Sequence, residues 1–210
     1  MEASFWHQRW ESNQLGFHQG VPNALMVRHF EALSLPENAR IFVPLCGKTR
    51  DIAWFLSRGH RVAGAELSRM AVEQLFAELG AVPEISACGA LSRFAAEGIE
   101  IFVGDIFDLT AEALGAVDAV YDRAALVAFP AGMRERYAAH LAAITNGAPQ
   151  LLLCLQYDQA TRQGPPFSID EVEVARIYGG RFALTRLERV AADGGAGAAA
   201  AMQETAWLLR

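Results

Sequence analysis

The stretch RIFVPLCGKTRDIAWFLSRGHRVAGAE, residues 40–66, decides the fold. It begins with an apolar run typical of a buried strand, turns at Gly47, and continues with apolar residues at helical spacing. A second apolar run, residues 62–65, leads directly into an acid, Glu66. The order of strand, tight turn, helix and strand, with a carboxylate about 20 residues after the turn, predicts a nucleotide-binding βαβ unit.

The turn indicates which kind of nucleotide this unit binds. In such a unit, backbone N–H groups of the turn face the ligand and the acid accepts hydrogen bonds from the ribose hydroxyls. Only Gly47 stands where the dinucleotide fingerprint would place three glycines, which argues against NAD. A ligand with a ribose but no phosphate, such as S-adenosylmethionine, makes fewer demands on the turn. Taken separately, Gly47 and Glu66 also fit a helix-entry turn and a surface acid, but together they favour a nucleoside site.

Length and composition limit the remaining alternatives. A chain of 210 residues with 52% hydrophobic residues predicts one domain, residues 1–210, with residues 1–35 packed on it as an aromatic and helical N-terminal segment. The net charge of −6 and the lack of lysine or arginine runs argue against a nucleic-acid partner. We expect no membrane segment, a cytoplasmic location and a monomer. The three cysteines are widely spaced and predict free thiols without a metal site.

Two further strands are expected to end near the same ligand. Residues 99–103 form a predicted strand followed by Asp105, Ile106 and Phe107, where a carboxylate and apolar side chains suit an adenine, although Asp105 could instead cap the next turn. Residues 116–120 form the next predicted strand and lead to Arg123. In an open α/β sheet, ligands bind outside the carboxyl ends of the strands, so these residues should converge with Gly47 and Glu66. A salt bridge to Asp122 or Asp105 is the alternative role for Arg123.

The rest of the chain supplies the walls of the expected site. Aromatic residues crowd the first 17 positions, Trp10 and Phe17 among them, and fit either a hydrophobic seal on the sheet or a lid over a ligand. Residues 82–98 are expected to be a loop plus a short helix, and residues 150–157 a buried strand. The segment at residues 163–167 places Pro166 and Phe167 either in a substrate pocket or in a simple turn. Two last strands, residues 182–190 and 203–209, flank a Gly/Ala-rich linker.

Several motifs together resemble the bacterial thiopurine S-methyltransferases. They are FWHQRW, NQLGFH, VPLCGK, GHRVAGAELS, GDIFDL, YDRAALVA and QYDQATRQGPPFS, and they cover most of the chain. The resemblance implies a Rossmann-like class I methyltransferase fold of the α/β class. This fold has a seven-stranded, mostly parallel sheet with an antiparallel last hairpin and helices on both faces. It also implies S-adenosyl-L-methionine as methyl donor and S-methylation of aromatic and heterocyclic thiols.

The resemblance also assigns roles to individual residues. Donor-binding residues fall on Trp10, Leu45, Glu66 and Arg123, with Asp105, Ile106 and Phe107 around the adenine. Animal enzymes of this family carry an arginine near the thiopurine in the loop before the last strand, whereas this chain has a Gly/Ala linker there. Arg123 is therefore the main cation expected near the acceptor, and we expect it to take part in catalysis by favouring an anionic acceptor or by holding the donor's carboxylate.

In the expected reaction, the protein mainly has to position the acceptor sulfur against the donor's methyl group. The methyl group of a sulfonium is already activated and aromatic thiols ionise readily, so alignment and exclusion of water should suffice. Bacterial members of the family are associated with selenium and tellurium species, so small chalcogen or halide nucleophiles are the alternative acceptors. A dehydrogenase with a degenerate turn and a non-catalytic nucleoside-binding protein are the alternatives from other classes.

Overall fold

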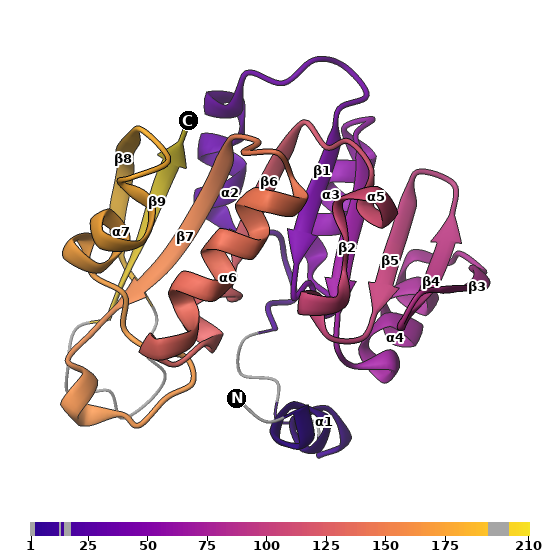
Figure 1. Cartoon of the computed structure of the whole chain (residues 1–210), viewed down its shortest axis with the longest axis horizontal. Coiled ribbons are helices and arrows are strands. Elements are labelled where there is room, and N and C mark those ends of the chain that lie inside the picture. The colour runs from indigo at the N-terminus through magenta and orange to yellow at the C-terminus, as the bar shows by residue number, and fades with distance from the viewer. Residues whose placement is uncertain (1–2, 13, 15–17, 193–201) are drawn as a thin grey trace.

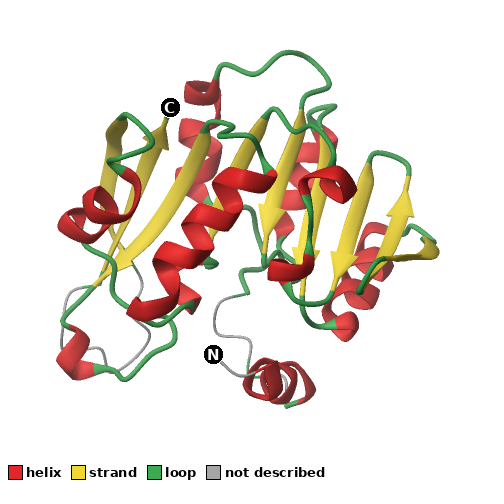
Figure 2. Cartoon of the chain, in the orientation of Figure 1, coloured by secondary structure: helices red, strands yellow, loops and turns green. Residues whose placement is uncertain are grey.

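The computed structural model describes residues 3–12, 14, 18–192 and 202–210. In this part of the chain, a mixed sheet lies between two layers of helices (Figures 1 and 2). The strands are β1 (Arg40–Pro44), β2 (Arg61–Glu66), β3 (Glu84–Cys88), β4 (Leu91–Ala96), β5 (Ile99–Val103), β6 (Ala119–Arg123), β7 (Gln150–Gln156), β8 (Leu184–Ala191) and β9 (Gln203–Leu209). The α-helices are α1 (Ala3–Glu11), α2 (Ala24–His29), α3 (Arg50–Ser57), α4 (Arg69–Leu79), α5 (Ala111–Leu114), α6 (Ala131–Ile144) and α7 (Glu171–Tyr178). Short 3-10 helices are η1 (Phe30–Leu33), η2 (Ile106–Asp108), η3 (Leu126–Ala128) and η4 (Gln159–Thr161).

The predicted βαβ unit is confirmed as β1, α3 and β2. The two strands pair in parallel along their whole length, with Ile41 opposite Val62. Helix α3 begins after Thr49, whose side chain accepts a hydrogen bond from the Asp51 backbone N–H and so caps the helix. Its apolar face, with Ile52 and Phe55 fully buried, packs against the sheet. The helix therefore returns the chain to the edge of β1 for a parallel second strand.

The sheet order places β1 at its centre. The full order is β3-β4-β5-β2-β1-β6-β7-β9-β8, and the five strands from β5 to β7 pair in parallel. Strand β2 lies on one side of β1 and β6 on the other, so the strand order reverses at β1. Open α/β sheets bind ligands at such a switch point, outside the carboxyl ends of the strands.

Within the described residues the sheet has nine strands, where seven were expected. The expected loop and short helix of residues 82–98 form the hairpin of β3 and β4, which adds to the edge at β5. Most residues of β3 are exposed, so this strand lacks the buried alternation by which strands are recognised in a sequence. The other seven strands form a parallel centre with the predicted antiparallel last hairpin, because β9 inserts between β7 and β8.

Strand β6 is also displaced from its expected position. It spans Ala119–Arg123 rather than residues 116–120, because its pairing with β1 begins where Ala119 stands opposite Ile41. The Asp118 backbone N–H donates to the Arg40 carbonyl just before this pairing. As a result, Arg123 is the last residue of the strand and does not lie in a loop beyond it.

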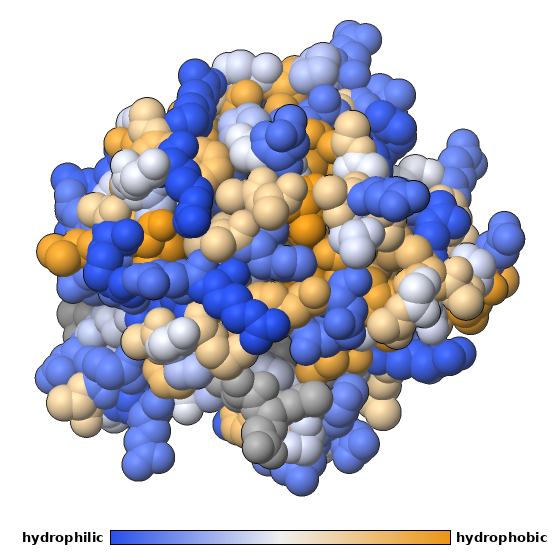
Figure 3. Space-filling model, in the orientation of Figure 1, coloured by the Kyte–Doolittle hydropathy of each residue, from blue (hydrophilic) through white to orange (hydrophobic). Residues whose placement is uncertain are grey.

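The two faces of the sheet carry different helices. Helices α2, α3 and α4 cover one face, and α5, α6 and α7 cover the other, each set packed on its own core cluster. Helix α1 lies apart from both layers, beyond the carboxyl ends of the parallel strands (Figure 1). Hydrophilic residues alternate with smaller hydrophobic areas on the face seen in Figure 3. No helix in the described ranges has the length and hydropathy needed to cross a membrane.

Candidate active site

A cavity of about 1200 Å³ opens at the carboxyl ends of the parallel strands. Its walls come from the segments that follow β1, β2, β5 and β6, from helix α1 and residues 18–25, and from the last hairpin. Every described residue predicted to bind the donor lines it, namely Trp10, Leu45, Gly47, Glu66, Asp105, Ile106, Phe107 and Arg123. The fold therefore brings residues from four strand ends and the N-terminal helix to one place.

Glu66 is fixed at the end of β2 by backbone groups. The Gly47 N–H donates to Glu66 Oε2 at 2.7 Å, and the Ser68 N–H donates to Oε1 at 2.8 Å. Burial raises the pKa of Glu66, and the backbone N–H groups of Ser68, Gly47 and Leu67 oppose this shift. A carboxylate oxygen has two lone pairs, so each oxygen can accept a further bond from a ligand hydroxyl. Two adjacent ribose hydroxyls match this arrangement.

The turn after β1 forms a tight cradle. Leu45 and Gly47 both have positive φ, 47° and 51°, which turns the chain sharply before α3. A Cβ atom on Gly47 would lie 3.1 Å from Cζ2 of Trp10, whose side chain is buried. The indole of the N-terminal helix therefore packs directly on the turn, where a side chain larger than glycine would push it away.

The segment that follows β5 also lines the cavity. Asp105 Oδ1 accepts a hydrogen bond from the Phe107 N–H at 3.0 Å, so its side chain has the capping role that the sequence left as an alternative. Ile106 and Phe107 supply the apolar wall. The Phe107 ring is backed by the guanidinium of Arg136, 3.9 Å from its centroid. A flat apolar ring such as adenine suits this wall.

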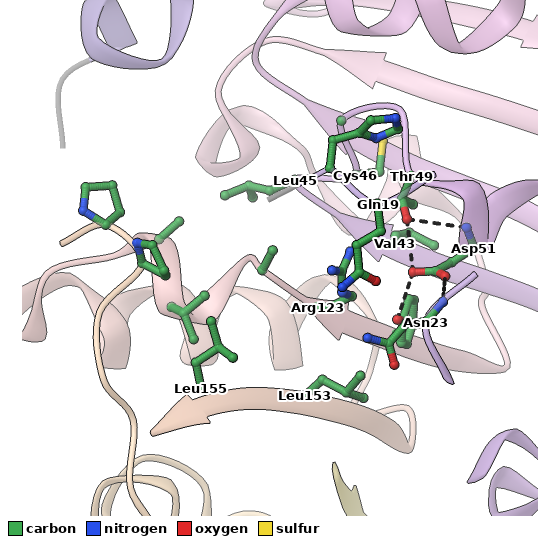
Figure 4. A pocket seen from close by; sticks show the side chains of 18 of the residues that line it. Gln19, Asn23, Val43, Leu45, Cys46, Thr49, Asp51, Arg123, Leu153 and Leu155 are labelled. Atoms are coloured by element: carbon green, nitrogen blue, oxygen red, sulfur yellow. Dashed lines mark hydrogen bonds between the residues drawn. The ribbon is translucent and has the colours of Figure 1, made fainter. Parts of the chain in front are cut away.

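Arg123 and Asp122 point to opposite faces of the sheet. The Asp122 carboxylate, fully buried, accepts hydrogen bonds from the Leu126 N–H at 3.1 Å and from the Tyr137 hydroxyl at 2.8 Å. Burial raises its pKa to about 6. Arg123 lines the cavity, on the same side as Gln19, Asn23 and Asp51 (Figure 4).

A buried polar network beside Arg123 has no counterpart in the sequence predictions. Asp51 is 1% exposed and accepts hydrogen bonds from the Asn23 N–H at 2.7 Å, the Tyr121 hydroxyl at 2.9 Å and the Thr49 hydroxyl at 2.9 Å (Figure 4). Asn23 also contacts Glu204 of β9 through its side-chain amide, at 3.3 Å from each carboxylate oxygen. The network ties the N-terminal segment to the turn after β1 and to the last strand.

The part of the cavity beyond Arg123 is mostly apolar. Val127, Ala128, Leu153 and Leu155 line it, together with Pro165 and Pro166, and a role of Pro166 in a substrate pocket stays a prediction. Phe167 does not lie in the described cavity wall. Its backbone N–H donates to the Val127 carbonyl at 2.7 Å, and its ring lies under the guanidinium of Arg134. Phe17, also predicted for the substrate pocket, lies outside the described residues.

The family follows from a comparison with known proteins. Residues 1–209 match the family model described as Thiopurine S-methyltransferase (TPMT). The chain belongs to the thiopurine S-methyltransferase family. The thiopurine S-methyltransferase of Xanthobacter autotrophicus is 55% identical over 210 residues, which are 100% of this chain and 99% of that protein. The predicted family is therefore confirmed.

Solved structures confirm the class of fold for this family member. A 1,6-didemethyltoxoflavin-N1-methyltransferase from Burkholderia thailandensis, with bound S-adenosylhomocysteine, has a TM-score of 0.64 at 16% identity and is covered to 86%, with 99% of this chain. The magnesium protoporphyrin IX methyltransferase of Synechocystis, with bound SAH, has a TM-score of 0.63 at 13% identity, with 99% of both chains covered. At sequence identities of 16% and 13%, these similarities show a shared fold and nothing about the substrate.

The four residues to which the thiopurine S-methyltransferase resemblance assigns donor binding are Trp10, Leu45, Glu66 and Arg123. All four line one cavity. Trp10 comes from α1, and the other three lie at or directly after the ends of β1, β2 and β6. Asp51, Asn23 and Glu204 join them in the wall and were not foreseen. The one available signal was the Thr-x-Asp pattern at residues 49–51, which is an ordinary helix start and does not by itself indicate a ligand site.

Proposed function

We propose that this chain is an S-adenosyl-L-methionine-dependent S-methyltransferase that acts on aromatic and heterocyclic thiols such as thiopurines. The observation that carries the proposal is the pairing of Glu66 with the Gly47 turn, in one cavity with the other predicted donor-binding residues. Membership of a family of methyltransferases and the methyltransferase fold support the same conclusion.

The residues present fit the donor. Glu66 would accept hydrogen bonds from the ribose hydroxyls, and the wall of Asp105, Ile106 and Phe107 would hold the adenine. Trp10 would cover the donor from the N-terminal side, above the turn of Leu45 and Gly47. When bound, the donor supplies a methyl group that its positive sulfur has already activated for attack.

Arg123 is the residue that we assign to both donor and acceptor. It lies at the end of β6, next to the turn after β1, where a guanidinium can pair with a carboxylate of the donor or favour an anionic acceptor. The apolar residues beyond it exclude water from an aromatic acceptor and leave a thiolate poorly solvated and reactive. Alignment and desolvation together account for the expected catalysis.

The apolar wall favours an organic acceptor over the alternatives. Leu153, Leu155 and Val127 offer no hydrogen bonds to a hydrated oxyanion such as selenite or tellurite, whereas they suit the face of an aromatic ring. A small organic thiol is therefore the proposed substrate class. The single domain, the monomeric state, the cytoplasmic location and the absence of a nucleic-acid partner stay predictions from the sequence.

Transfer of labelled methyl from S-adenosylmethionine tests the proposal. The acceptors are 6-mercaptopurine, a simple aromatic thiol, selenite and tellurite. Transfer to the organic thiols by the wild type and by Glu73→Ala, an exposed control, but not by Glu66→Ala, is expected. Transfer to the oxyanions alone would refute the acceptor class, and transfer to no acceptor would refute the function.

A further inference from the structure

The acceptor half of the cavity contains a carboxylate without an assigned role. Among the described residues, four acids line the cavity: Asp51, Glu66, Asp105 and Glu204. Asp51 is engaged by three hydrogen-bond donors, Glu66 is fixed by backbone N–H groups, and Asp105 caps the turn that begins η2. Glu204 differs from these three, because within the described residues its side chain accepts hydrogen bonds from a single side-chain amide, that of Asn23, at 3.3 Å.

The place of Glu204 in the sheet puts it on the acceptor side. It stands in β9 opposite Leu155 of β7, which lines the cavity with Leu153. The proposed donor contacts end at β6, and β9 lies two strands beyond β6 in the sheet order. Strands are spaced by about 4.8 Å, so the backbone of β9 lies about 10 Å past that of β6. The donor residues do not extend that far across the sheet.

Asn23 holds Glu204 in a state ready to accept a hydrogen bond. Asn23 Oδ1 accepts from the Met26 N–H at 3.1 Å, which fixes the orientation of the amide and directs its NH₂ group to Glu204. The amide can only donate in that direction. A half-buried carboxylate at the rim of an apolar wall, positioned by a single amide, retains capacity to accept a proton or a hydrogen bond from a ligand.

We propose that Glu204 accepts the proton that a heterocyclic acceptor in its thione form loses during S-methylation. This inference rests on the proposed function. As the acceptor's N–H bond breaks, the proton passes to a Glu204 oxygen and the N–H electron pair moves through the thioamide to sulfur. The sulfur forms the new bond to the methyl carbon, and the bond between that carbon and the donor sulfur breaks. Two neutral thioethers leave, and Glu204 passes the proton to water.

Charged groups around Glu204 set the conditions of a pH experiment. Among the described residues, the charged and titratable groups that line the cavity with Glu204, that its charge affects or that lie on the paired strand include Arg28 of α2, Asp51 of α3, Tyr121 and Arg123 of β6, Cys154 of β7, Arg189 of β8 and His18 before α2. Burial lowers the pKa of His18, and this histidine is present in the wild type and in a Glu204 variant alike. The pKa values of Tyr121 and Cys154 are raised far from neutrality, mainly by burial, so these two do not titrate in the working range. A change in the pH profile that appears only in a Glu204 variant therefore reports on Glu204.

The test compares two acceptors in Glu204→Gln, which keeps the size of the side chain and its contact with Asn23. 6-Mercaptopurine carries ring N–H groups, whereas 4-nitrothiophenol has none and ionises readily by itself. We expect kcat/KM for 6-mercaptopurine to fall by about 100-fold or more, the usual contribution of a general base, and that for 4-nitrothiophenol to stay within about threefold. The exposed variant Glu73→Gln should resemble the wild type with both acceptors.

A binding measurement gives a readout that does not depend on turnover. The ultraviolet absorption of 6-mercaptopurine differs between its thione and thiolate forms, so titration of the complex with S-adenosylhomocysteine gives the pKa of the bound acceptor. The Glu204 carboxylate would accept a hydrogen bond from the N–H of the bound thione and repel a thiolate, so this pKa should be lower in Glu204→Gln than in the wild type. An equal fall in kcat/KM for both acceptors, an unchanged rate for both, or weaker binding of S-adenosylhomocysteine would overturn the proposal, the last by assigning Glu204 to the donor. If the wild type methylates neither acceptor, the proposed function itself fails.

Discussion

Glu66 and Gly47 are 19 positions apart in the chain, and a hydrogen bond of 2.7 Å joins the Gly47 backbone nitrogen to Glu66 Oε2. The bond couples the end of β2 to the turn after β1. The carboxylate thus orders the same turn that faces the ligand, and the ligand's ribose would meet an acid whose position is already fixed. Donor affinity should therefore depend on Glu66 both directly and through the turn.

Replacement of Glu66 by Ala should weaken binding of S-adenosylhomocysteine by roughly 10-fold to 100-fold, since hydrogen bonds to a charged group contribute about 1.5–3 kcal/mol. Titration calorimetry measures this loss. Glu73→Ala, on the exposed face of α4, should bind as the wild type does. Unchanged affinity in Glu66→Ala would show that Glu66 does not bind the donor.

Alanine substitutions at Gly47 and Gly89 can be compared to test the packing of Trp10 on the turn after β1. Both have positive φ, 51° and 60°, but a Cβ on Gly89 would meet no atom within 4 Å. Alanine at either position should lower the free energy of unfolding by about 1–2 kcal/mol because of its backbone conformation. Only Gly47→Ala should also weaken donor binding, because its Cβ displaces the indole. Equal donor affinities in the two variants would contradict a role for this contact.

Arg123→Ala should weaken donor binding or lower turnover of an ionised thiol, by roughly 10-fold or more, because a charge-assisted hydrogen bond is lost. Calorimetry with S-adenosylhomocysteine and steady-state kinetics separate the two roles. Arg123→Lys keeps the charge but not the two-pronged geometry, and should fall between the wild type and Arg123→Ala. If both affinity and turnover are retained in Arg123→Ala, neither role stands.

Asp122 should make stability depend on pH in the weakly acidic range. Its pKa rises from 3.8 to about 6 on folding, so the folded state holds a proton more tightly than the unfolded state. Stability contributed by this proton is fully present below about pH 4 and is lost as the pH rises through 6. Two pKa units correspond to roughly 3 kcal/mol, an upper bound for this effect.

Denaturant unfolding between pH 4 and 7 measures the dependence. The wild type should become more stable relative to Asp122→Asn as the pH falls through this range, since asparagine cannot take up the proton. Asp108→Asn, at an exposed site, serves as the control for loss of a carboxylate. A difference between wild type and Asp122→Asn that does not vary with pH would show that Asp122 does not titrate there.

The elements whose signals are local in the sequence could be predicted from it. The apolar runs of β1 and β2, the spacing in α3 and the positions of Gly47 and Glu66 all lie within 27 residues, so the unit could be recognised from its own periodicity. Ser68 caps the start of α4 and Gly80 ends the helix, and both are local signals of the same kind. The hairpin of β3 and β4 could not be predicted in this way, because β3 is an edge strand held by hydrogen bonds to β4 and not by a buried face.

Some residues of the candidate site could likewise be located from the sequence, and others could not. Residues at strand ends could be located from the strands, which is why Glu66, Asp105 and Arg123 were placed correctly in one cavity. Asn23 and Glu204 could not, because they are 181 positions apart and neither lies in a recognisable motif. Their contact depends on β9 being the neighbour of β7, which only the assembled sheet determines.

The position of β1 in the middle of the sheet has a consequence for how acceptor preference can change. Apart from Trp10 and Arg123, the proposed donor residues lie within residues 40–108, whereas residues 119–206 supply most of the acceptor half of the cavity. The two halves are separate blocks of sequence that meet along one line between β1 and β6. Substitutions in the second block at positions other than Arg123 can therefore reshape the acceptor wall while the proposed donor residues stay unchanged, so that specificity can be re-engineered, or can drift during evolution, without rebuilding the enzyme.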